Sequence, residues 1–171
     1  MRPTFAVILA LLPITAAVAQ EPAAEASCAN VRVALPAEFS GWSEQIPVSA
    51  GVKPGDGATV SVGKAANVSL HPAKHLALSP APEKAAAVDS NGGTLAVSIV
   101  TAGTYRLALG GAAWVDLVQD GKAVASSAHD HGPKCTGVRK MVDFKLTPGT
   151  YAIQLSGSAT PSLALMLVKL A

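Results

Sequence analysis

The densest group of reactive side chains in this 171-residue sequence is the run Ala128–Cys135, in which one residue separates His129 from His131. If the strand pattern before this run persists, both imidazoles point to the same face, about 6–7 Å apart, and can share a zinc or copper ion. His71 and His75 are the remaining histidines, and they could complete a four-histidine site if the two segments are neighbours. Solvated loop histidines are the commoner arrangement, so a metal site is one of two open interpretations.

Asp116 and Asp143 each lie between two apolar residues. Paired carboxylates serve glycoside hydrolysis when one occupies an apolar pocket and its partner lies about 5–10 Å away. No feature of the sequence places the two aspartates in this way, and cross-strand ion pairs with nearby basic residues such as Arg106 are the expected alternative. The sequence also holds no Gly-x-Ser-x-Gly nucleophile motif and no glycine-rich phosphate loop. We therefore predict no catalytic residue and favour a protein that is not an enzyme.

Trp42 and Trp114 are the two tryptophans, and their rings could form a platform on which a sugar stacks. Packing in the core is the alternative use of both rings, because the chain holds only two Trp, two Tyr and three Phe. Ligand stacking at Trp42 and Trp114 therefore remains a hypothesis.

The N-terminal 19 residues have the three parts of a secretory signal peptide: the charged Arg2, an apolar run from Phe5 to Leu12, and small residues up to Ala19. We predict cleavage after Ala19 and a periplasmic or secreted protein. A retained membrane anchor is the alternative, although Pro13 interrupts the run and a span needs about 20 apolar residues. No insertion in the membrane is expected after cleavage.

Cys28 and Cys135 are the only cysteines, 107 positions apart. In an exported chain such a pair predicts a disulfide, which could stabilise the fold by about 4–5 kcal/mol in the chain-entropy model. A metal-bound thiolate is the alternative.

Charged residues make up only 14% of the chain, and its formal net charge is +2. Coiled coils, helical bundles and nucleic-acid-binding proteins contain far more charge, so these classes are excluded. No nucleic-acid partner is expected. The expected partner is a component of the cell envelope or a small ligand.

Three prolines, Pro36, Pro47 and Pro54, break residues 20–57 into a predicted arm of short extended pieces. From residue 58 to 171 the apolar residues alternate with polar ones, which predicts about eight to ten short strands. Within this region Asp120-Gly121 predicts a tight hairpin turn, and Asn91-Gly92-Gly93 predicts a further turn. The predicted strands include Val60–Leu70, Leu95–Ile99, Tyr105–Leu109, Trp114–Val118, Val142–Leu146, Tyr151–Leu155 and Leu163–Leu167.

A Gly-Thr-Tyr motif followed by an alternating strand occurs twice, at Gly103–Tyr105 and at Gly149–Tyr151. The tyrosine ring can pack in a core while its hydroxyl group reaches the backbone at the corner of a sandwich. The pattern predicts an all-β fold, a single antiparallel β-sandwich of jelly-roll or immunoglobulin-like type.

Several segments of the chain resemble a family of small exported proteins from alphaproteobacteria. They are Ala113–Val118, Ala128–Cys135, Arg139–Phe144, Pro148–Tyr151 and the Leu-Pro-x-x-x-x-Gly-Trp element at Leu35–Trp42. The family has no established activity to carry over. The C-terminal half also resembles the bacterial pre-peptidase type of sandwich, a fold-level similarity that implies no function.

Some members of that family carry the label homogentisate 1,2-dioxygenase, which would imply a ferrous enzyme that opens an aromatic ring. The chain departs from that enzyme in its size, in its leader and in lacking a set of two histidines and a glutamate. The glutamates beyond residue 30 are Glu38, Glu44 and Glu83.

The leading prediction is a periplasmic β-sandwich with a non-enzymatic binding or envelope role and no cofactor. The alternatives are a zinc- or copper-binding protein that uses the His129/His131 segment and, from the family label alone, an iron-dependent ring-cleaving oxygenase.

Overall fold

The computed structural model describes Cys28, Val31 and residues 33–171. The predicted signal peptide, residues 1–19, lies outside the described residues. The described part forms twelve β-strands and two short 3-10 helices, η2 (Ala37–Phe39) and η3 (Ala73–His75). The strands are β1 (Ile46–Ser49), β2 (Thr59–Val60), β3 (Ala65–Ser69), β4 (His71–Pro72), β5 (Asn91–Ile99), β6 (Gly103–Leu109), β7 (Trp114–Gln119), β8 (Lys122–Val124), β9 (Ser126–His131), β10 (Lys140–Leu146), β11 (Gly149–Ser158) and β12 (Ser162–Lys169).

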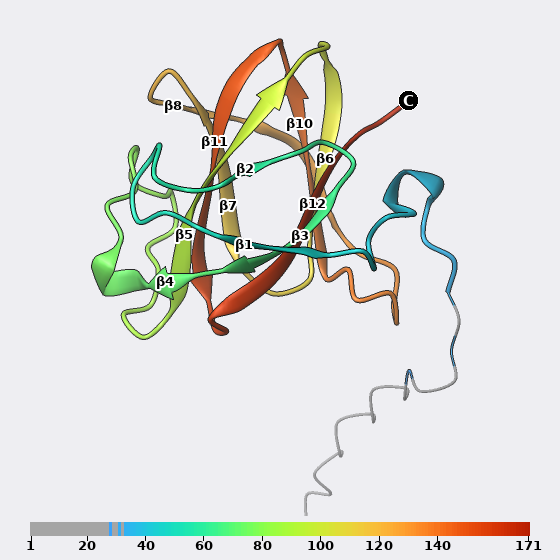
Figure 1. Ribbon diagram of the computed structural model, residues 1–171, viewed down its shortest axis with the longest axis horizontal. Helices are drawn as coiled ribbons and strands as arrows, with labels where there is room; N and C mark the ends of the chain where they lie inside the picture. The colour runs from blue at the N-terminus through green and yellow to red at the C-terminus, as the bar shows by residue number, and fades with distance from the viewer. Residues whose placement is uncertain (1–27, 29–30, 32) are drawn as a thin grey trace, which may run out of the picture. The chain divides into compact units, whose positions relative to one another are not determined.

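The strands form two sheets that make a sandwich (Figure 1). The first sheet has the order β1-β3-β12-β6-β10-β9, and the second has the order β2-β5-β11-β7-β8, with β4 also paired to β5. The predicted all-β sandwich is therefore confirmed.

Two strand pairs depart from the predicted antiparallel arrangement, because β1 pairs with β3 and β2 pairs with β5 in parallel. The physical reason is that the chain alternates between the sheets here: β1 belongs to the first sheet, β2 to the second and β3 to the first again. A chain that leaves a sheet and returns after such a crossover can enter it in the same direction, whereas a direct hairpin cannot. The other strand pairs in the two sheets are antiparallel.

The main core lies between the two sheets and consists of the inward-facing residues that the alternation predicts. It includes Leu95, Val97 and Ile99 of β5, Tyr105, Leu107 and Leu109 of β6, and Leu163, Leu165 and Leu167 of β12. Each set occupies every second position, so all its members point to one face of the strand.

A second apolar cluster lies on the other face of the first sheet. It includes residues that point away from the main core, such as Ala108 of β6, Met141 of β10 and Met166 of β12. Phe39 and Trp42 belong to this cluster and are 0% and 5% exposed. The central strands of the first sheet, β6, β10 and β12, are therefore buried on both faces.

Part of the predicted arm, residues 20–57, packs with the strands of the sandwich. The compact unit that contains the sandwich begins at Val31. Within the predicted arm, β1 pairs with β3, and Phe39 and Trp42 are core residues. Prolines interrupt this segment as expected, but its few large apolar side chains are enough to hold it against the sheet.

The two Gly-Thr-Tyr motifs form equivalent corners, as predicted. The Tyr105 hydroxyl donates a hydrogen bond to the Thr101 carbonyl at 2.7 Å, and the Tyr151 hydroxyl donates one to the Thr147 carbonyl at 2.9 Å. Both tyrosine rings are buried in the main core. Each motif thus fixes the start of a strand to the loop that precedes it.

The predicted Asp120-Gly121 turn is confirmed, since these residues have φ angles of 50° and 74°, as a tight hairpin turn requires. The predicted turn at Asn91-Gly92-Gly93 is wrong, because these residues begin β5. A Cβ atom on Gly92 would collide with the backbone oxygen of Leu155, and one on Gly93 would collide with Ala50. Close packing, and not chain reversal, explains these two glycines.

Both cysteines are disulfide-bonded, and because the chain holds only two, the predicted Cys28–Cys135 pair is confirmed. Within the described residues, no helix has the length and apolar character needed to cross a membrane.

Candidate functional site

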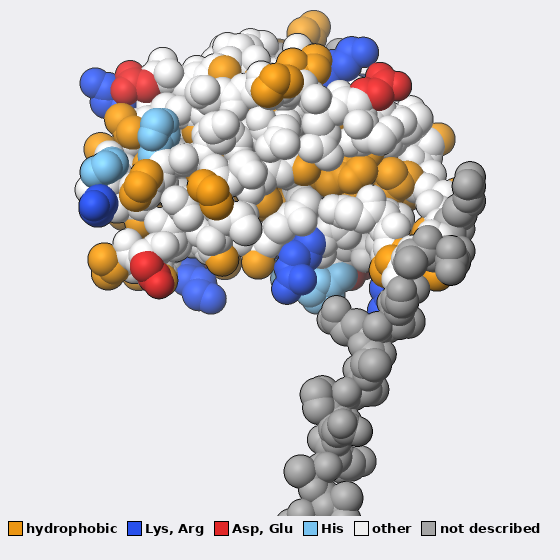
Figure 2. All heavy atoms as spheres, turned by 60° about the horizontal axis from the view of Figure 1, so that its bottom comes forward, with side chains coloured by type: hydrophobic (Ala, Val, Ile, Leu, Met, Phe, Trp, Pro, Cys, Tyr) orange, Lys and Arg blue, Asp and Glu red, His pale blue; other side chains and the backbone are white. Residues whose placement is uncertain are grey.

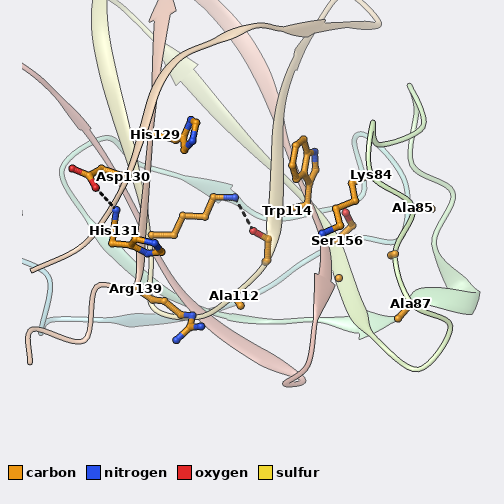
Figure 3. A pocket seen from close by; sticks show the side chains of 14 residues that line it. Lys84, Ala85, Ala87, Ala112, Trp114, His129, Asp130, His131, Arg139 and Ser156 are labelled. Carbon is orange, nitrogen blue, oxygen red and sulfur yellow. Dashed lines mark hydrogen bonds between the residues drawn. The ribbon is translucent and has the colours of Figure 1, made fainter. Parts of the chain in front are cut away.

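A cleft of about 850 Å³ lies between the edge of the first sheet and the neighbouring part of the second. Figure 3 shows His129, His131 and Arg139 on one side and Lys84 and Trp114 on the other. We call this cavity the Trp114 cleft. The histidines come from β9, Arg139 directly precedes β10, and Trp114 is the first residue of β7.

Two features of the sequence leave this space open. β9 is the last strand of the first sheet, and all six of its residues are exposed. Alanines line much of the remaining wall, in the segments 85–87 and 112–113. Their small side chains cannot fill the gap between the sheets, so a hollow remains.

Trp114 is held in a defined orientation at this cleft. Its Nε1–H group donates to Oδ1 and Oδ2 of Asp116, at 3.0 and 3.1 Å. The two residues are two positions apart on β7, so both side chains lie on the same face of the strand. Asp116 therefore positions the indole ring and does not form the cross-strand ion pair that the sequence suggested.

Lys140 of β10 reaches across the cleft to the opposite wall. Its Nζ lies 5.3 Å from the centroid of the Trp114 ring, within the range of a cation–π interaction. The same Nζ donates a hydrogen bond to the Ala113 carbonyl at 3.2 Å, drawn as a dashed line in Figure 3. Lys140 thus connects the two sheets beside the exposed part of the indole.

Burial disfavours the charged forms of Asp116 and Lys140. It raises the pKa of Asp116, an effect that the Trp114 hydrogen bond partly offsets. It lowers the pKa of Lys140, an effect that the negative charge of Asp116 partly offsets and the positive charge of Lys84 reinforces. Because the folded-state pKa of Asp116 is above its unfolded value, the contribution of this residue to stability falls as pH rises through that interval.

The basic side chains around the cleft form no ion pair within the described part of the chain, although the charge of Asp116 acts on Lys140. The one ion pair found there lies elsewhere, where Arg106 Nε donates to Asp143 Oδ1 at 2.7 Å and Arg106 Nη2 donates to Oδ2 at 2.8 Å. These two residues are directly opposite on β6 and β10, so the cross-strand ion pair expected for Asp143 is confirmed. Asp130 borders the cleft, but its Oδ1 accepts the backbone N–H of His131 at 2.7 Å.

The four histidines are divided between two regions. His129 and His131 occupy alternate positions of β9, on one side of that strand. His71 lies on β4, where its Nε2 is 2.9 Å from the Ala50 carbonyl oxygen, and His75 ends η3. Residues 28, 31 and 33–171 contain no group of three or more His, Cys, Asp or Glu side chains that could hold a metal ion.

The two tryptophans also differ in position. Trp42 is buried in the second apolar cluster, so its ring cannot join a surface platform. Trp114 borders both the Trp114 cleft and an adjoining cavity of about 580 Å³. Of the predicted stacking pair, only Trp114 is placed where a ligand could reach it.

On the face drawn in Figure 2, the described Lys and Arg side chains are scattered and form no continuous patch. The grouping of basic residues that matters chemically is therefore local to the cleft.

No family model and no curated protein matches the sequence. Among solved structures, the chain is similar to the pre-peptidase C-terminal domain of a collagenase from Bacillus anthracis. The identity is 12%, the similarity covers 64% of this chain and 93% of that domain, and the TM-score is 0.40. This similarity assigns no ligand or activity to the chain.

Proposed function

We propose that this chain is an exported, non-enzymatic β-sandwich protein that binds a small ligand in the Trp114 cleft. The observation that carries the proposal is the position of Trp114. Every other aromatic ring in the described part of the chain is buried, whereas Trp114 borders a cleft and is anchored there by Asp116 and Lys140.

The size and composition of the cleft support a binding role. Its volume of about 850 Å³ is within the range of small-molecule sites, which combine apolar walls with a few convergent polar groups. Here the alanines and Trp114 supply the apolar wall, and Arg139 and Lys140 supply the polar groups. The disulfide and the predicted leader support export, because disulfides persist in oxidising compartments.

The proposal is tested by titrating the oxidised protein with a panel of oligosaccharides and aromatic acids while its tryptophan fluorescence is recorded. We expect a saturable change with at least one compound, and loss of binding in Trp114→Ala, measured by calorimetry because this variant lacks the fluorescent reporter. Val100→Ala, at a residue that is 84% exposed and outside the cleft, is the control and should bind as the parent does. The proposal fails if nothing binds at millimolar concentrations, if Trp114→Ala binds normally, or if the bound compound is turned over.

A metal-binding role is a second candidate, because His129 and His131 lie on one side of an exposed edge strand. Elemental analysis of untagged protein, and of a His129→Ala/His131→Ala variant, tests it. Zinc or copper in the parent and not in the variant would support this role, and no metal in either would remove it.

The ring-cleaving oxygenase implied by the family label would need ferrous iron on two histidines and a carboxylate. The described residues do not bring such a set together. We derive no reaction through iron for this chain.

A further inference from the structure

The chemical class of the ligand can be inferred from the charges at the Trp114 cleft, on the premise that the cleft is a ligand site. Lys84, Arg139 and Lys140 all line it. In the part of the chain that the structure describes, none of the three forms an ion pair. An anion that entered the cleft would meet three cations that form no direct ion pair with a described carboxylate, although the charge of Asp116 acts on Lys140 from a greater distance.

Lys140 is the cation best placed to meet such an anion. One of its three N–H donors is used, in the bond to the Ala113 carbonyl, and the Trp114 ring provides a weak additional interaction. The charge of Asp116 favours the charged form of Lys140, and the charge of Lys84 opposes it. A ligand anion would accept the donors of Lys140 that remain.

The shape of the space favours an elongated ligand. The adjoining cavity meets the cleft at Trp114 and is lined by Glu83, Asp116 and Lys122 among other residues. Trp114 lines both cavities, which have volumes of about 850 and 580 Å³. A chain of several sugar rings is long enough to contact both, whereas a single aromatic acid would occupy one.

The two ends of this space differ in charge. The first cavity is lined by Lys84, Arg139 and Lys140 against one carboxylate, Asp130, whereas the second is lined by Glu83 and Asp116 against one cation, Lys122. An acidic group is therefore favoured in the first cavity over the second. Sugar hydroxyl groups suit the second, because they donate hydrogen bonds to carboxylates.

We infer that the Trp114 cleft binds an acidic oligosaccharide, with its carboxylate or sulfate group at Lys140 and Arg139 and its neutral rings extending past Trp114. An indole presents an apolar face and edge against which a sugar ring can pack, so the ring and the cations act on adjacent parts of one ligand.

The test measures the affinities of four compounds by calorimetry: a neutral tetrasaccharide, the same tetrasaccharide with one terminal uronate, its analogue with one terminal sulfate, and benzoate. We expect the uronate or the sulfate compound to bind at least about tenfold more tightly than the neutral one, and benzoate to bind more weakly than either. Whichever of the two acidic compounds binds more tightly identifies the acidic group that the cleft prefers.

Lys140→Met should reduce the preference for the acidic compound by about tenfold, and Lys140→Arg should retain most of it. Lys145→Met is the matched control, because Lys145 is an exposed lysine on the same strand that does not line the cleft. It should leave the preference unchanged.

Equal binding of the neutral and acidic tetrasaccharides would overturn this inference and leave the proposed ligand site standing. The same holds if benzoate binds most tightly. If none of the four compounds binds and the fluorescence panel is also negative, the proposed function itself fails.

Discussion

The two tyrosine corners allow a quantitative test of how the sandwich is held together. Replacing each tyrosine with phenylalanine removes the hydroxyl group and leaves the buried ring in place. The Tyr105 hydroxyl makes one hydrogen bond, to the Thr101 carbonyl. The Tyr151 hydroxyl donates to the Thr147 carbonyl at 2.9 Å, accepts the Thr147 backbone N–H at 3.1 Å and makes a longer contact of 3.3 Å with Thr147 Oγ1.

The expected losses follow from the number of bonds removed. A typical hydrogen bond contributes about 1 kcal/mol to the free energy of unfolding. Tyr105→Phe should therefore lower this free energy by about 1 kcal/mol and Tyr151→Phe by about 2 kcal/mol. Thr101 and Thr147 are exposed, so water can reach the groups left behind, and these figures are upper values.

Urea unfolding of the oxidised protein, followed by circular dichroism, measures both losses. The slope of the free energy of unfolding against urea concentration should not change, because neither variant alters the surface buried on folding. The two tyrosines lie on β6 and β11, in different sheets, so their losses should add to within about 0.5 kcal/mol in the double variant. A loss for Tyr105→Phe equal to or larger than that for Tyr151→Phe would refute the reasoning.

Three further outcomes are expected in the same unfolding assay. Replacing Cys28 and Cys135 with serine should lower the free energy of unfolding by up to about 4 kcal/mol, and an unchanged value would mean that the disulfide does not constrain the unfolded chain. Gly92→Ala should cost at least about 2 kcal/mol because its Cβ would collide with backbone, whereas Gly41→Ala, which has room, should cost less than about 0.5 kcal/mol. Lys140→Met should lower the free energy of unfolding by no more than about 1 kcal/mol, because losing the hydrogen bond to the Ala113 carbonyl is partly offset by removing a partly buried charge, and a larger loss would make Lys140 structural.

The alternation of apolar and polar residues predicts a strand well where one face of that strand is buried in the core. The alternation at Leu95–Ile99 and at Tyr105–Leu109 corresponds to the inward faces of β5 and β6, and the repeated Gly-Thr-Tyr motif corresponds to the two corners. The Asp120-Gly121 turn follows from backbone conformation alone. These features depend on neighbours in the sequence.

Features that depend on distant segments could not be predicted in this way. Gly92 and Gly93 have the composition of a turn, but their small size serves contacts with Leu155 and Ala50. Phe39 looks like part of a loose arm, because the sheet that buries it is formed mainly by residues far along the chain.

The candidate site was only partly visible in the sequence. Trp114 was a candidate together with Trp42, and the burial of Trp42 separates the two. Arg139-Lys140 is the one adjacent pair of basic residues, a weak signal. Its placement opposite Trp114 results from the meeting of β10 and β7 across the sandwich, which no local pattern specifies.

The claim that Trp114 forms the ligand site is tested most directly by the indole N–H signals of the protein in solution. The chain gives two such signals, one from Trp42 and one from Trp114, which Trp114→Phe assigns. Titration with the tetrasaccharide that binds most tightly should shift the Trp114 signal and leave that of the buried Trp42 in place. A shift of the Trp42 signal alone, or of neither signal at saturating ligand, would contradict the assignment of this cleft.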